Sequence, residues 1–173
     1  MIRAAPALRE AGFRSMLGAG GIMETGMRLA EFAQGIGSTR TTDWVVLDQA
    51  RINQFADCTD DHQFIHVDPE AAAKVTGTGG TIAHGFLTLS LIGGMGMRQI
   101  EDVEKQMGLN YGFEKVRFLT PVPEGSRVRG VFKLAEAAER KPGQWLLQFD
   151  VTMEIEGSER PALSAQWLLH CTA

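Results

Sequence analysis

The sequence is poor in cysteine and has no surplus of basic residues, and both facts exclude classes of protein. Its two cysteines, Cys58 and Cys171, lie in apolar segments without the C-x-x-C spacing of metal or redox sites. Small secreted domains usually depend on several disulfides, so the sequence predicts a reduced, cytoplasmic protein. The 17 Lys and Arg residues are outnumbered by 21 Asp and Glu residues, for a formal net charge of −4. Because nucleic-acid binding depends on an excess of positive charge, nucleic acid is not expected as the main partner.

Long apolar runs are also missing, and with them the usual signals for secretion or membrane insertion. Residues 1–21 contain scattered arginines but no continuous apolar core of a secretory signal. The stretch 75–97 has no charged residue and is long enough to span a bilayer, yet 7 of its residues are glycine and 4 are threonine. We therefore expect a buried glycine-rich loop followed by a buried helix, in a soluble protein without a membrane segment.

The proportions of residue types are those of one folded domain. Apolar residues make up 44% of the chain and charged residues 22%. We divide the chain into an N-terminal extension, residues 1–40, and a main domain, residues 41–173. Within the extension, apolar residues over 27–36 recur at helical spacing and predict a short accessory helix that ends near Gly35 or Gly37.

Helices are expected in the first part of the main domain. Asp48 has a side chain that can cap a helix over residues 49–57. Asp68-Pro69-Glu70 combines a capping side chain, a proline in the first turn and an early acid, and predicts a second, short helix. The apolar segment 82–97 predicts a third, buried helix.

The second half of the chain alternates apolar and polar residues, as half-buried strands do. Strands are expected at about 111–119, 127–134, 144–155 and 163–169, with a hairpin turn at 156–158. Helices followed by an antiparallel meander predict an α+β fold. The nearly uncharged helix must be covered on most sides, and a curved antiparallel sheet wrapped around it would do that.

Two motifs carry a resemblance to a known family. The first is D-H-Q-F-I-H-V-D-P at 61–69, followed by I-A-H-G-F-L at 82–87. The second comprises Asn110-Tyr111-Gly112, Val116-Arg117-Phe118 and Pro121-Val122. Over about residues 43–170 the chain resembles the MaoC-like dehydratases and (R)-specific enoyl-CoA hydratases, and within them the nodulation-protein-N-like branch. The resemblance implies a hot-dog fold, a curved antiparallel sheet around a long central helix, and a homodimer or higher homo-oligomer.

The resemblance also implies reversible hydration of 2-enoyl thioesters, or dehydration of (R)-3-hydroxyacyl thioesters. Asp61 and His66 would be the catalytic pair, and the backbone N–H of Gly85 the oxyanion donor. General chemistry agrees, because the reaction needs a base for water, a proton donor for the α-carbon and stabilisation of an enolate-like oxygen. A carboxylate and an imidazole can hold one water and move its protons near neutral pH. The first turn of a helix presents N–H groups without intrahelical partners.

We expect further substrate contacts at His84, Gln63, Phe64, Tyr111 and Arg117. For His84, the alternatives are a hydrogen bond to buried backbone or the positioning of the following glycine. For Tyr111, core packing is equally compatible with the sequence. Arg117 either lies on an ordinary solvated sheet face or contacts the phosphates of coenzyme A or an acidic carrier protein.

The chain departs from the family pattern at two positions. Asp60 replaces the glycine that commonly precedes the catalytic aspartate; it could raise the pKa of Asp61 by like-charge repulsion, or simply face solvent. Gly93 stands where hydratases close to the type enzyme carry a serine. If that serine positions the catalytic aspartate, this chain must do without it or use Ser90.

Alternatives to the hydratase assignment remain open at this point. The same fold could support an acyl-CoA thioesterase in which Asp61 activates water against the carbonyl, or a non-catalytic acyl-thioester-binding module. No cofactor is expected, since coenzyme A or the phosphopantetheine of an acyl carrier protein would belong to the substrate. No metal is expected, because Cys58 and the nearby histidines lack the ligand spacing of a closed zinc site.

Overall fold

The structure is a computed structural model and describes residues 26–173. Its helices are α1 (Leu29–Phe32), the 3-10 helix η1 (Ala33–Gly35), α2 (Gln49–Thr59), α3 (Phe64–Val67), α4 (Pro69–Ala73) and α5 (Gly85–Arg98). Its strands are β1 (Met27–Arg28), β2 (Thr39–Thr41), β3 (Val45–Val46), β4 (Val103–Glu104), β5 (Met107–Phe118), β6 (Arg127–Lys141), β7 (Gln144–Ile155) and β8 (Leu163–Thr172). Helices α2 to α5 therefore precede the long strands, as the α+β prediction requires.

The main sheet is antiparallel and runs in the order β2-β6-β7-β8-β5, with β3 also paired to β6. Its register follows the alternation of apolar residues, because Val151 of β7 lies opposite Phe132 of β6 and Ala165 of β8. All three side chains are buried and belong to the core. In the predicted hairpin turn, Gly157 has a φ of 76°, a conformation that glycine adopts without steric cost.

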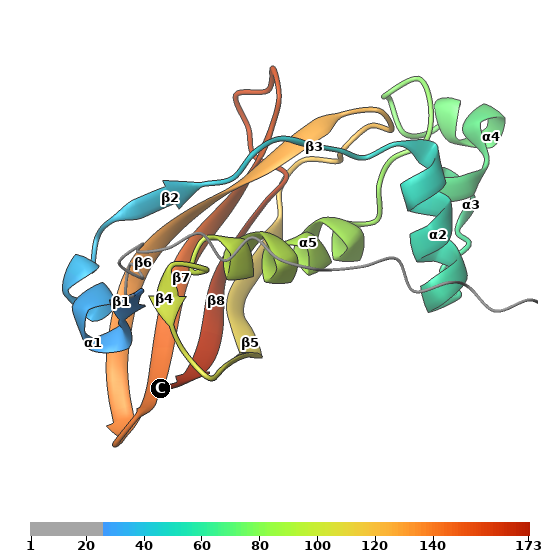
Figure 1. The fold of residues 1–173 in the computed structure, drawn as a ribbon. Helices are drawn as coiled ribbons and strands as arrows, with labels where there is room; N and C mark the ends of the chain where they lie inside the picture. The colour runs from blue at the N-terminus through green and yellow to red at the C-terminus, as the bar shows by residue number, and fades with distance from the viewer. Residues whose placement is uncertain (1–25) are drawn as a thin grey trace, which may run out of the picture.

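Helix α5 packs against the curved sheet and completes the core (Figure 1). Its buried residues Ile92 and Met95 join a cluster that includes Phe132 and Trp167. A Cβ on Gly96 would lie 2.2 Å from Cζ3 of Trp167, so only glycine allows this approach of helix to sheet. The predicted sheet wrapped around a central helix is confirmed. No helix within residues 26–173 has the length and apolar character needed to cross a membrane.

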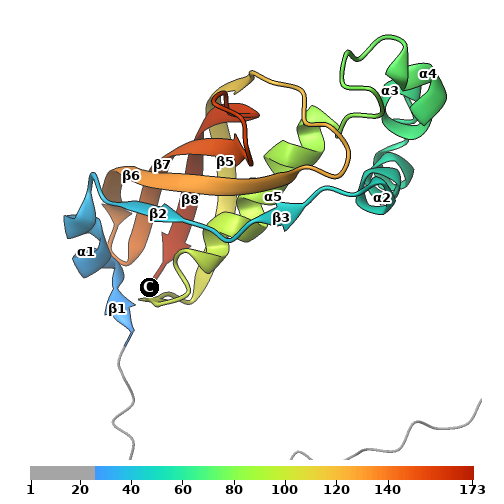
Figure 2. The same cartoon turned by 90° about the horizontal axis from the view of Figure 1, so that it is seen from above.

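Helices α2, α3 and α4 form a group beyond one end of the sheet, next to the start of α5 (Figure 2). The predicted caps are present: Asp48 accepts a hydrogen bond from the N–H of Arg51, and Asp68 accepts from those of Glu70 and Ala71. Helix α3 was not expected, since its four residues fall at the end of a polar loop and are too few to show helical periodicity.

The central helix begins later than the sequence indicates. Its first residue is Gly85 rather than residue 82. Ile82 forms a β-bridge with Pro123, and the N–H of Ala83 donates to the carbonyl of Val122. Segment 82–84 is thus held extended against the β5–β6 connection, and this contact is invisible in the local sequence.

The predicted extension is described only from residue 26 onward. Residues 1–25, and with them the expectation that no secretory signal is present, lie outside the described residues. The accessory helix is α1 continued by η1, and it ends at Gly35. Its Leu29 and Phe32 are buried in the core. Strand β2 crosses the proposed boundary at residue 40 and pairs with β6, while the division into two parts stays a prediction.

Candidate active site

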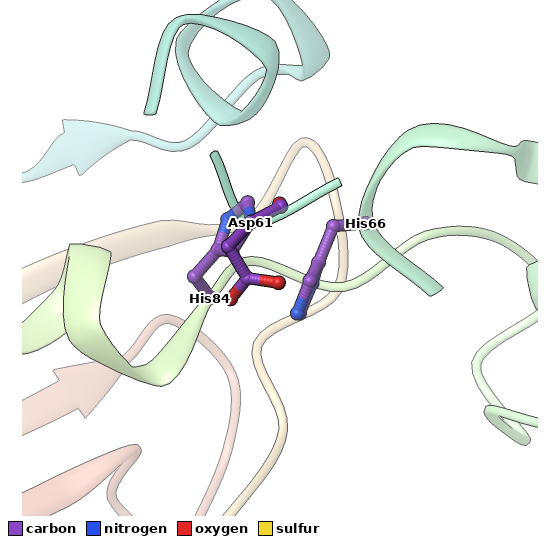
Figure 3. A group of neighbouring side chains, drawn as sticks. All are labelled: Asp61, His66 and His84. Atoms are coloured by element: carbon purple, nitrogen blue, oxygen red, sulfur yellow. The ribbon is translucent and has the colours of Figure 1, made fainter. Parts of the chain in front are cut away.

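Three polar side chains meet beside the first turn of α5 (Figure 3). Asp61 follows α2, His66 lies on α3, and His84 directly precedes α5. The nearest ligand-type atoms of the three side chains all lie within 4.8 Å of one another. His66 and His84 are 7% and 2% exposed, whereas Asp61 is exposed. An accessible carboxylate therefore stands beside two buried imidazoles.

Asp61 is aimed by the way in which α2 ends. Asp60, the residue after the helix, has a φ of 57° and a ψ of 20°, in the left-handed region. A residue with a Cβ is disfavoured there by about 1–2 kcal/mol, although aspartate tolerates it better than most. The backbone conformation explains why the family pattern favours glycine at this position. The sharp turn directs the chain toward α3 and brings Asp61 to His66.

His66 is held in one tautomer. Its Nδ1 lies 2.7 Å from the carbonyl oxygen of Ile82. Because a carbonyl only accepts, Nδ1 carries the proton, and Nε2 in the neutral ring is left as a base. Burial lowers the pKa of His66 below its ordinary 6.5, and His84 lowers this pKa further, against the opposing effects of the Ile82 carbonyl and Asp61. The neutral imidazole is thus the favoured form at neutral pH.

His84 contacts both Asp61 and His66. Its Nε2 lies 2.9 Å from the main-chain oxygen of Asp61, so Nε2 is the protonated nitrogen. Its ring stacks on that of His66, with centroids 3.7 Å apart and an interplanar angle of 26°. The ring of Phe55 also packs on it, at 5.0 Å between centroids. Nδ1 of His84 is buried and has no hydrogen-bond partner among the described residues.

A glutamine on α2 fixes the main chain around His66. Nε2 of Gln49 donates to the main-chain oxygen of His66 over 2.8 Å, and its Oε1 accepts from the hydroxyl of Thr81. The N–H of Ile82 donates to the carbonyl of Ile65. Sequence reasoning missed Gln49 and Thr81, because neither belongs to a motif and their contact spans 32 residues.

A cavity of about 320 Å³ opens beside this cluster. Its lining is mainly apolar and includes His66, Gly85, Thr88, Phe118, Thr120 and Ala162. A Cβ on Gly85 would lie 3.0 Å from the Phe118 ring, so the glycine keeps the wall open at that point. As the first residue of α5, Gly85 carries an amide that has no intrahelical acceptor. The hydroxyl of Thr120 is buried without a partner among the described residues, and no motif in the sequence marks this residue.

The other predicted substrate contacts lie elsewhere. Gln63 precedes α3 and uses its carbonyl to accept from the N–H of His66, while Phe64 is 44% exposed. Tyr111 is 67% exposed on β5. Arg117 donates to the main-chain oxygen of Val116. None of Gln63, Phe64, Tyr111 and Arg117 is among the residues that line the cavity, and their roles stay predictions.

Asp61, His66 and His84 are also the group that could hold a metal ion within residues 26–173. Two of the four imidazole nitrogens, Nδ1 of His66 and Nε2 of His84, are already directed at main-chain carbonyls. A metal would have to use the remaining nitrogens and the carboxylate. The expectation of a metal-free site stays a prediction.

Comparison with known proteins identifies the family. The family description "MaoC like domain" matches residues 31–146, which is most of the chain. The chain belongs to the MaoC-like family. This MaoC-like protein is 52% identical over 128 residues to "Nodulation protein N" of Rhizobium leguminosarum bv. viciae, covering 73% of this chain and 80% of that one. It is 41% identical over 153 residues to "3-hydroxyacyl-thioester dehydratase Z" of Mycobacterium tuberculosis, covering 87% and 100%.

Solved structures confirm the hot-dog fold of this MaoC-like protein. An (R)-hydratase of A. caviae, described as involved in PHA biosynthesis, superposes with a TM-score of 0.66 at 22% identity, covering 78% of this chain and 94% of that one. A monoamine oxidase regulatory protein of Archaeoglobus has a TM-score of 0.70 at 24% identity, covering 79% and 90%. The family and branch expected from the motifs are confirmed, as is the assignment to the hydro-lyases.

The structure also shows what surrounds Gly93, the second departure from the family pattern. A Cβ on Gly93 would lie 3.1 Å from Nδ2 of Asn110, so the asparagine amide occupies the region next to this glycine. Oδ1 of Asn110 accepts from the indole of Trp167 over 3.0 Å. Ser90 donates to the carbonyl of Phe86 within α5. That bond turns the hydroxyl of Ser90 to its own helix rather than to Asp61.

Proposed function

We propose that the chain catalyses the reversible hydration of 2-enoyl thioesters to (R)-3-hydroxyacyl thioesters. The observation that carries the proposal is the pairing of an accessible carboxylate with a neutral imidazole at a largely apolar cavity whose lining includes Gly85, the first residue of α5. The dehydratase and (R)-hydratase names of the relatives support the same reaction class.

In the proposed mechanism, Asp61 and Nε2 of His66 bind one water between them. The water loses a proton to this pair as its oxygen attacks the β-carbon of the substrate, and the electron pair of the double bond moves toward the thioester oxygen. The pair then returns a proton to the α-carbon. The net change is addition of H and OH across the double bond, and both groups recover their starting protonation states.

The enolate-like oxygen would be stabilised at the start of α5. The amide of Gly85 lacks an intrahelical acceptor, and the positive end of the helix dipole lies at the same place. Donors that are fixed before the reaction stabilise charge that develops only in the transition state. In other enzymes, loss of one such donor costs about 3–4 kcal/mol of barrier.

The proposed substrate carrier is coenzyme A or the phosphopantetheine of a carrier protein, and the proposed assembly is a homodimer. Strand β5 ends the sheet, and three of its apolar side chains are strongly exposed: Met107 by 46%, Leu109 by 49% and Tyr111 by 67%. An exposed apolar edge strand is a template for pairing with another chain. A second copy pairing along β5 would cover it.

The test is the loss of the conjugated enoyl-thioester absorbance when the protein is added to crotonyl-CoA and longer analogues. Asp61→Asn and His66→Gln should each lower kcat by about 100-fold or more, the usual contribution of a general acid or base. Asp60→Asn and His62→Gln are matched controls, since these neighbours are exposed and lie outside the cavity lining.

Equal rates for the wild type and both site variants would overturn the assignment of Asp61 and His66. Release of free thiol without loss of the double bond would instead identify a thioesterase. Calorimetric binding of the acyl-CoA without turnover would identify a binding module.

A further inference from the structure

We infer that His84 is a positioning residue for the proposed hydration, fixing Asp61, His66 and Gly85 relative to one another. The inference rests on the proposed function and extends it to a residue that lines no part of the cavity. It comes from the contacts of the buried His84 side chain with Asp61 and His66, and from the covalent link of His84 to Gly85.

The first contact holds the main chain of Asp61. Nε2–H of His84 donates to the carbonyl oxygen of Asp61 over 2.9 Å, and it ties the end of the sharp turn at Asp60 to the beginning of α5. Asp61 is itself exposed, and its side chain makes no hydrogen bond or ion pair with any other described residue. The main-chain contact therefore fixes the backbone position from which this carboxylate projects.

The second contact limits the motion of the His66 ring. The two imidazoles are stacked at 3.7 Å between centroids, so one face of His66 is covered by His84. The carbonyl of Ile82 fixes the edge of the same ring through Nδ1. Rotation of His66 would have to break both contacts, so the ring is held in one orientation beside the cavity that His66 helps to line.

The third contact is covalent. His84 is the residue immediately before Gly85, and its carbonyl accepts from the N–H groups of Leu87 and Thr88. The side chain that positions Asp61 and His66 thus belongs to the residue directly before Gly85, whose amide is the proposed oxyanion donor. A displacement of about 1 Å between such groups can lower a rate by about 100-fold.

The unpartnered nitrogen of His84 makes the inference testable by amide substitution. Only Nε2 makes a hydrogen bond, while Nδ1 has no partner among the described residues. The side-chain nitrogen of glutamine reaches the position of Nε2, whereas that of asparagine reaches only the position of Nδ1. Asparagine is also a good residue for the start of a helix, so a purely structural role in capping α5 would favour it.

The experiment compares His84→Gln, His84→Asn and His84→Phe on crotonyl-CoA. We expect His84→Asn and His84→Phe to lose about 100-fold in kcat, with KM within about threefold of wild type. His84→Gln should stay within about tenfold of wild type, because it keeps the hydrogen bond to Asp61 and loses only the ring stacking on His66. Circular dichroism and urea unfolding check that each variant is folded.

Two outcomes overturn the inference in an active protein: His84→Asn at least as active as His84→Gln, or a loss confined to KM. If His84→Asn does not fold, Phe55→Leu gives a second test, since it removes a ring packed on His84 and leaves the hydrogen bond. It should lower kcat by about threefold to tenfold through freer motion of His84, and an unchanged kcat would count against the inference. A wild-type protein without hydratase activity would refute the proposed function instead.

Discussion

The two ends of α5 are held by different kinds of interaction. Near its C-terminal end, Met95 and Gly96 pack on Phe132 and Trp167, all of them buried. At its N-terminal end, the residues of the candidate site are joined by single hydrogen bonds to main-chain carbonyls. Apolar contacts are numerous and non-directional, whereas each of these hydrogen bonds fixes one atom at one place. Substitutions at the first end should therefore change stability, and those at the second end should change rate.

The largest effect on stability is expected for Gly96→Ala. The new methyl group would meet the Trp167 ring at 2.2 Å, so helix and sheet must move apart. We expect a loss of about 2–3 kcal/mol in the free energy of unfolding. Gly94→Ala is the matched control two residues away, where the nearest atom is the flexible end of Arg98 at 3.9 Å. It should gain about 0.5–1 kcal/mol, since alanine is the better helix former. Urea unfolding measures both, and equal effects would contradict the packing argument.

The site end is probed by Gln49→Leu. This change removes the hydrogen bonds to the carbonyl of His66 and to Thr81 but keeps a side chain of similar size. We expect kcat to fall about tenfold, because the main chain under His66 is released. The free energy of unfolding should fall by only about 1 kcal/mol. Arg51→Leu, on the same helix and exposed, should change neither quantity appreciably. An unchanged kcat for Gln49→Leu would contradict the expectation that substitutions at the N-terminal end of α5 change the rate.

The pH dependence sharpens the comparison, because the pKa of His66 is lowered in the folded state, chiefly by burial. Above the ordinary pKa of about 6.5 the ring is neutral in both the folded and unfolded chain and adds no pH dependence. Between that value and the lowered pKa of the folded state, the unfolded chain binds the proton more readily, so stability declines as the pH falls. Urea midpoints should therefore fall more for wild type than for His66→Gln between about pH 7.5 and pH 5. The rate should decline over the same acid range, and parallel midpoints would exclude a buried neutral His66.

The smallest effect is expected at Asp60. Asp60→Gly relieves the left-handed backbone at φ 57° and should raise the free energy of unfolding by about 0.5–1 kcal/mol. Cys58→Gly, two residues earlier within α2, should lower it by about the same amount. Hydratase activity of Asp60→Gly should equal that of wild type. A loss of stability in Asp60→Gly would show that the side chain matters more than the turn.

The sequence predicts the sheet half of the molecule better than the site half. Strand 144–155 was predicted with its observed bounds, because alternation over 12 residues is a strong signal. The caps at Asp48 and Asp68 were also found, since capping depends on adjacent residues. The late start of α5 could not be predicted, because it depends on pairing with Val122 and Pro123, which are distant in the sequence.

At the candidate site, the sequence indicated which residues to expect but not which hydrogen bonds join them. The motif brought Asp61, His66 and Gly85 together through the resemblance alone. Nothing local to Gln49 marks it as a partner of His66, since 17 residues separate them. His84 was expected to contact substrate or backbone; its bond to the carbonyl of Asp61 agrees with the backbone alternative. Most of the hydrogen bonds that align this site are accepted by main-chain carbonyl oxygens. Such acceptors are present at every residue, so the sequence does not mark them.

The residues around the cavity come from two separate parts of the sequence, and this bears on how such a protein could be re-engineered. The residues assigned to the chemistry, Asp61, His66 and Gly85, come from one continuous stretch, whereas much of the remaining lining comes from 118–122 and Ala162. These two parts of the site are encoded separately, one in the segment between α2 and the start of α5 and the other at the end of β5 and in the connections between strands. For the proposed hydratase, we therefore expect that exchange of the strand connections would change which acyl chain is accepted and leave the residues assigned to the chemistry in place.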